Sequence, residues 1–121
     1  MRRVELHHDT LVITLSGFTM LEALQGKLVI PYRHITHVHA RLRIPPRLLR
    51  VGGTTLGTIH EGHYIGDRGW YFLSYEHPDR IVTIDLDSFY LGRQPYLAVA
   101  IEVDDPETLA KAITQRMTST N

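Results

Sequence analysis

The amino-acid sequence predicts a mostly β protein that forms one domain over residues 1–121. We expect about seven antiparallel strands in a curled sheet or partly open barrel, followed by an amphipathic helix at the C-terminus. Apolar and polar residues alternate with a period of two over most of the chain, as in strands with one buried face. Short polar links of hairpin length separate these runs. After Asp104 the apolar period changes to that of a helix.

The first part of the chain contains four strand-like runs, at residues 4–7, 11–16, 27–32 and 35–42. The polar segment His8-Asp9-Thr10 has the length of a hairpin turn between the first two. Pro31 cannot donate a ladder hydrogen bond, so the third strand ends there or lies at a sheet edge. Between the second and third runs, Met20 to Leu24 indicates a helical turn that is too short to be stable alone.

Residues 44–58 interrupt the alternation. Pro45-Pro46 and Gly52-Gly53 punctuate this segment, and we expect it to be the longest irregular loop of the chain. Loops of this length commonly carry a function. Four further strands are predicted at residues 57–65, 70–76, 81–86 and 96–103. The links at residues 66–69 and 77–80 have hairpin length, and residues 88–95 form another connection.

The predicted strand at residues 70–76 carries most of the aromatic side chains of its region. Alternation places Trp70 and Phe72 on one face and Tyr71 and Tyr75 on the other. We expect one pair to lie in the core, and the other to cover an outer surface or an interface.

The predicted helix spans about residues 105–117, and a polar tail follows it at residues 118–121. Asp105 suits the N-cap and Pro106 the first helical position. Leu109, Ile113 and Met117 recur at helical spacing, so they form one apolar stripe. We expect this stripe to cover one open end of the sheet.

Composition excludes several classes of protein. The chain has no cysteine, which excludes disulfides, thiolate metal sites and cysteine nucleophiles. Thirteen basic and thirteen acidic residues give zero formal net charge, so no nucleic-acid partner is expected. The start of the sequence carries no apolar signal region, and no apolar run is long enough to cross a membrane. These features predict a cytoplasmic location.

The zero net charge conceals two opposed blocks. Residues 23–60 contain six basic residues and no acidic residue, whereas residues 61–121 contain ten acidic and five basic residues. The basic block is densest at residues 41–50, where Arg41, Arg43, Arg47 and Arg50 alternate with leucine, isoleucine and proline. These arginines are the candidate binding residues. They fit a solvated strand face, a surface for a protein partner or self-association, or a contact with anionic lipid or a phosphorylated small molecule.

The histidines and acids give weaker signals. His37 and His39 would share one face of a strand, but arginines follow them where a cation site would need an acid, so no metal and no cofactor are predicted. His60 and His63 are three residues apart and face opposite ways on a strand. Asp85 and Asp87 would share a face, for which solvent exposure is a sufficient explanation. No nucleophile elbow or phosphate loop is present, so the sequence does not predict an enzyme.

Several short phrases resemble those of small bacterial pleckstrin-homology (PH)-like proteins of unassigned function. They are Leu15-Ser16-Gly17, the segment from Leu21 to Gly26, Ile30-Pro31 ahead of Ile35, and the segment from Val103 to Glu107. The resemblance implies a PH-like fold, a cytoplasmic setting and a binding role, without catalytic residues. The expected function is therefore a non-catalytic binding or scaffolding module for a protein partner. The alternative is a peripheral binder of anionic lipid or a phosphorylated small molecule.

Overall fold

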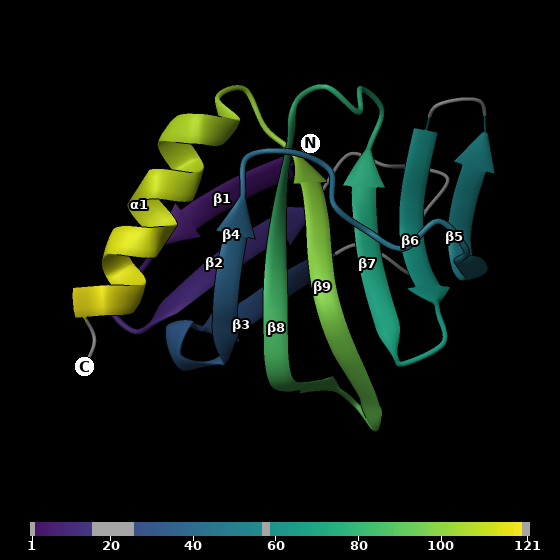
Figure 1. Cartoon of the computed structure of the whole chain (residues 1–121), viewed down its shortest axis with the longest axis horizontal. Helices are drawn as coiled ribbons and strands as arrows, with labels where there is room; N and C mark the ends of the chain where they lie inside the picture. Colours follow the sequence, from purple (N-terminus) through teal and green to yellow (C-terminus); the bar gives the residue numbers. More distant parts are fainter. Residues whose placement is uncertain (1, 16–25, 57–58, 120–121) are drawn as a thin grey trace.

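The protein forms two β-sheets and one C-terminal helix (Figure 1). The computed structural model describes residues 2–15, 26–56 and 59–119. The predicted mostly β class with a final helix is confirmed. The strands do not close into a barrel, however, because they divide into a three-stranded and a six-stranded sheet. The predicted turn at residues 20–24 lies outside the described residues.

The smaller sheet is antiparallel, with the strand order β1-β2-β3. It contains β1 (Arg2–Leu6), β2 (Thr10–Leu15) and β3 (Gly26–Pro31). The predicted hairpin is confirmed, because β1 and β2 pair around His8 and Asp9. Pro31 ends β3, which is also an edge strand. Leu11, Ile13 and Leu15 alternate toward the core.

The larger sheet has the strand order β4-β8-β9-β7-β6-β5. A short 3-10 turn, η2 (Tyr32–His34), leads into it from β3. Its strands are β4 (Ile35–His39), β5 (Leu49–Leu56), β6 (Ile59–Ile65), β7 (Trp70–Tyr75), β8 (Ile81–Leu91) and β9 (Gln94–Glu102).

Three features of this sheet correct the sequence-based expectation. Residues 77–80 do not form a hairpin: β9 lies between β7 and β8 and pairs with β7 in parallel, so the sheet is not wholly antiparallel. The predicted connection at residues 88–95 is mostly strand, because Ser88 with φ 57° and a register shift let β8 continue to Leu91. The predicted loop at residues 44–58 contains β5, whose two glycines hide the alternation.

The main core lies between the two sheets and is covered at one side by α1 (Pro106–Ser119). Ile113 is fully buried there, and Leu109 and Met117 pack against the same cluster. The Asp105 carboxylate accepts hydrogen bonds from the backbone N–H and the hydroxyl of Thr108, at 3.2 and 2.8 Å. The predicted N-cap and apolar stripe are therefore confirmed. In the described residues, no helix is long and apolar enough to cross a membrane.

Candidate functional site: a basic strap across the outer face

The connection between β4 and β5 crosses the outer face of the six-stranded sheet. These two strands are the opposite edges of the sheet, so the chain must pass over one of its faces (Figure 1). We call residues 40–48 the strap. Leu42, Ile44 and Leu48 of the strap are partly buried and pack against a second hydrophobic cluster on the outer face. The strap thus gives this sheet a second, smaller core. Its buried members include Tyr64, Tyr71, Leu73, Tyr75, Ile81, Ala98 and Ala100.

This arrangement corrects the expectation for the aromatic strand. Phe72 lies in the main core, and Trp70 packs against it. Tyr71 and Tyr75 point the other way, as predicted, but they are buried beneath the strap rather than forming a surface or an interface. Burial raises the pKa of both phenols.

Two contacts hold the strap against the sheet. The fully buried hydroxyl of Thr83 on β8 donates to the Arg41 carbonyl at 2.7 Å and accepts from the Arg43 N–H at 3.0 Å. At the other end, a Cβ on Gly66 would lie 2.9 Å from Leu48 Cδ2. The absence of a side chain at Gly66 lets the strap approach the β6–β7 turn closely.

The four predicted binding arginines lie along or next to this strap, and all are exposed. Arg41 and Arg43 alternate with the inward Leu42 and Ile44, but they lie on an irregular segment and not on a strand face, because β4 ends at His39. Within the described part of the chain, Arg41, Arg43 and Arg47 form no ion pair. Their charge is therefore directed to solvent and not used to stabilise the fold.

Two grooves adjoin the strap. One, of about 290 Å³, is lined by Arg43, Ile44, Pro45, Tyr71, Asp85, Leu97 and Ala98. The other, of about 510 Å³, lies between the end of the strap and the β6–β7 turn. We call the second the strap groove; it is lined by Pro46, Arg47, Leu48, Leu49, Ile65, Gly66 and Asp67.

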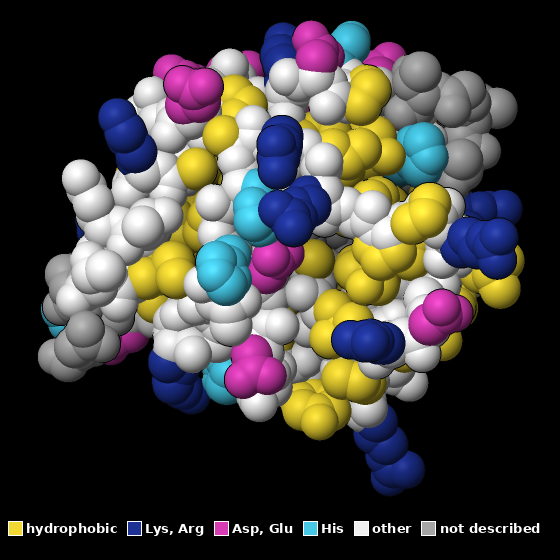
Figure 2. Space-filling model, viewed as in Figure 1, with side chains coloured by type: hydrophobic (Ala, Val, Ile, Leu, Met, Phe, Trp, Pro, Cys, Tyr) yellow, Lys and Arg dark blue, Asp and Glu magenta, His cyan; other side chains and the backbone are white. Residues whose placement is uncertain are grey.

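Large apolar side chains are exposed where the strap joins β5. Leu49 is 73% and Val51 is 56% accessible to solvent. Figure 2 shows hydrophobic side chains gathered on the β5–β7 side of this face, with basic side chains around them. Sequence reasoning identified the arginines and included Leu49 in the same candidate segment, residues 41–50, but it missed Val51. The available signal was the apolar run around Arg50. The prolines before this run and the glycines after it are typical of a loop, and they hid the signal.

The histidines have structural partners. His39 Nε2 lies 2.8 Å from Asp85 Oδ2 and bridges β4 to β8, while the ring of His37 stacks on that of His39 at 6.1 Å. Asp85 therefore pairs with a histidine, and not with the exposed Asp87. His60 and His63 do face opposite ways: His60 stacks on Tyr75, and His63 contacts Phe72 and Tyr96. Over the described residues, no three histidine or acidic side chains meet as metal ligands.

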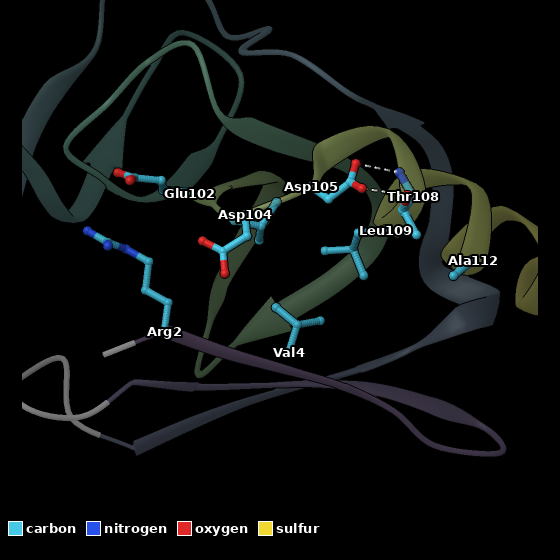
Figure 3. A pocket seen from close by; sticks show the side chains of 9 residues that line it. Arg2, Val4, Glu102, Asp104, Asp105, Thr108, Leu109 and Ala112 are labelled. Atoms are coloured by element: carbon cyan, nitrogen blue, oxygen red, sulfur yellow. Dashed lines mark hydrogen bonds between the residues drawn. The ribbon is translucent and has the colours of Figure 1, made fainter.

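A further pocket of about 440 Å³ lies between β1 and the start of α1 (Figure 3). Most of its charged groups already hold the fold together. Asp105 caps α1, Glu102 accepts the backbone N–H groups of Glu76 and His77, and Arg2 pairs with Glu61. This leaves the pocket with few polar groups that are directed toward a ligand.

Sequence reasoning also missed the buried charge of Glu61, which is 2% exposed on β6. Its carboxylate accepts a hydrogen bond from Ser74 at 2.6 Å and pairs with the Arg2 guanidinium from the other sheet. Burial raises the pKa of Glu61, and Ser74 and Arg2 oppose that shift. This network joins the two sheets but lies away from the strap.

Comparison with known proteins adds no identification, since the chain matches no protein-family model, no curated protein and no solved structure. The strap, its grooves and the exposed start of β5 are therefore the features of the chain that indicate a function.

Proposed function

We propose that the protein is a non-catalytic binding module of the PH-like type, which engages a protein partner through its strap face. We define the strap face as the strap together with residues 49–51. The observation that carries this proposal is the exposure of Leu49 and Val51 beside the outward arginines of the strap.

Physical chemistry supports a protein partner. Exposed leucine and valine side chains gain free energy when a partner removes them from water. Arginine and apolar side chains together are typical of the residues that dominate protein interfaces. The second core beneath the strap supports the backbone that carries them, so the surface is presented without a large ordering cost.

The PH-like relationship is part of the same proposal. Two sheets packed face to face and a final helix across one side of their core are consistent with it. A module of this kind presents one surface to another macromolecule, and the strap face provides guanidinium and aliphatic groups rather than an arrangement of acid, base and nucleophile.

The proposal can be tested with two matched valine substitutions. Val51 on β5 and Val29 on β3 are both exposed valines on edge strands, but they belong to different sheets. We expect a partner captured from cell extract by the wild-type chain to be retained by Val29→Lys and reduced at least about tenfold by Val51→Lys, as measured by quantitative mass spectrometry. Equal recovery with both variants would contradict the proposal.

A lipid surface is the alternative ligand, and a second experiment distinguishes it from a protein partner. Co-sedimentation with vesicles of anionic phospholipid, at low and high salt, measures that affinity directly. Vesicle binding could require Arg41, Arg43 and Arg47, fall with salt and be unchanged by Val51→Lys. This result would show that the strap face binds a membrane and not a protein partner.

A further inference from the structure

We infer that the partner segment is acidic and carries a large apolar side chain, which enters the strap groove while an adjacent carboxylate binds Arg47. This inference rests on the proposed function and adds the chemistry of the partner. It follows from the shape, the lining and the charge of the strap groove.

The strap groove has the size and the walls of a site for an apolar side chain. Its volume of about 510 Å³ lies within the range of natural binding pockets, about 300–1,000 Å³. Leu48 of the strap, Leu49 of β5 and Ile65 of β6 provide its apolar walls. Leu49 is mostly exposed, so an inserted side chain would cover apolar surface that the isolated chain leaves in water.

The charge around this groove is mainly positive. Arg47 lines it, and the exposed Arg68 follows the lining residue Asp67 in the β6–β7 turn. Among the described residues that line the groove, Asp67 is the only acidic one. Since Arg47 forms no ion pair with the described residues, its guanidinium is available for a bidentate contact with a carboxylate. These charges favour an acidic segment.

The same charges disfavour a second copy of this chain as the occupant. A two-fold contact between copies places the same patch on both sides of the interface. Arg47 and its neighbours would then face their own counterparts across a desolvated contact, where like charges repel strongly. An acidic segment from a different protein meets no such penalty.

The test is selection of peptides from a random display library on the full chain, followed by affinity measurements on the enriched sequences. We expect enrichment of peptides in which aspartate or glutamate flanks leucine, phenylalanine or tryptophan. Arg47→Glu should weaken their binding at least about tenfold, and Leu49→Lys should do the same. Arg93→Glu reverses an exposed charge at the β8–β9 turn and serves as the matched control, with an expected change below about twofold.

Replacing the acidic residues of a selected peptide by their amides separates charge from shape. This replacement should weaken binding to the wild-type chain but have little further effect on Arg47→Glu, because the two changes remove the same contact. Enriched peptides that lack acids but still depend on Leu49 would overturn the acidic partner and leave the proposed function intact. Failure to obtain any peptide that depends on Leu49 or Val51 would overturn both.

Discussion

Glu102 concentrates several interactions on one carboxylate. It accepts the backbone N–H groups of Glu76 and His77 at 2.7 and 2.8 Å, and it pairs with the side chains of His77 and Arg80. Burial alone would raise the pKa of Glu102, but the N–H groups of His77 and Glu76 and the His77 side chain outweigh it and lower the pKa to about 2. The ionised carboxylate of Glu102 therefore stabilises the chain reversal between β7 and β8.

The depressed pKa gives the first prediction. Glu102 contributes stability above its ordinary pKa of 4.5, and this contribution is lost as the pH falls toward about 2. We expect Glu102→Gln to lower the free energy of unfolding at pH 7 by about 2 kcal/mol, a value reduced for the exposure of its partners. Urea unfolding across this pH range should show that the free energies of unfolding of the wild-type chain and of Glu102→Gln become equal at the acid end.

Glu107→Gln is the control for this prediction, because Glu107 is an exposed glutamate in the first turn of α1. It should change the free energy of unfolding by no more than a few tenths of a kcal/mol, about the value of a helix-dipole contact. A deficit for Glu102→Gln that stays constant down to pH 2 would show that its charge is not the stabilising feature.

At the scale of elements, one hydroxyl joins the strap to the sheet by hydrogen bonds. Thr83 is fully buried and satisfies both the Arg41 carbonyl and the Arg43 N–H. Sequence alternation could not identify this role, because a threonine in a strand is ordinary and its partners are about 40 residues away. The position of β9 between β7 and β8 is non-local in the same way. The predicted link at residues 77–80 has the length of a hairpin, and only the tertiary structure shows that β7 and β8 do not pair.

Replacing Thr83 by valine preserves the side-chain shape and removes both hydrogen bonds. We expect Thr83→Val to lower the free energy of unfolding by about 1–3 kcal/mol, the cost of losing both hydrogen bonds that the Thr83 hydroxyl makes to the strap backbone. Hydrogen exchange should show faster exchange of the Arg43 amide and of the strap, with little change in the core strand β9.

Thr36→Val supplies the comparison, since Thr36 is exposed on β4 and makes one long hydrogen bond of 3.4 Å to the Asp85 carbonyl. Its expected cost is below about 0.5 kcal/mol. Equal exchange rates in the strap for both variants would mean that the apolar contacts of Leu42 and Ile44 are sufficient to hold it.

For the whole molecule, the sequence was most informative where one local period governs a segment. The alternation in β2 and the Asp105 cap with its helical stripe were both found, because each depends on neighbours along the chain. The division into two sheets, the strap and its grooves depend on contacts between distant segments. The arginines of the candidate site were predictable from charge, whereas the exposure of Leu49 was not.

The buried network of Arg2, Glu61 and Ser74 is the clearest contact of this distant kind. Arg2 comes from the three-stranded sheet, and Glu61 and Ser74 come from the six-stranded sheet. The Glu61 side chain is 2% exposed and that of Arg2 is 17% exposed. Removing only the cation would leave a carboxylate in an apolar interior, which costs more than the pair itself contributes.

We therefore expect Arg2→Met to lower the free energy of unfolding at pH 8 by about 3 kcal/mol, and Arg2→Met with Glu61→Gln to recover most of that loss. The folded-state pKa of Glu61 is already raised and rises further without Arg2. The folded state then binds a proton more tightly than the unfolded state, so the stability of Arg2→Met decreases as pH rises from 4.5 through that raised pKa. Urea unfolding at pH 5 and pH 8 should show this decrease for the single variant and a much smaller one for the double variant. If the double variant were as unstable as Arg2→Met at both pH values, the cost would come from lost packing of the arginine side chain and not from an unpaired charge between the sheets.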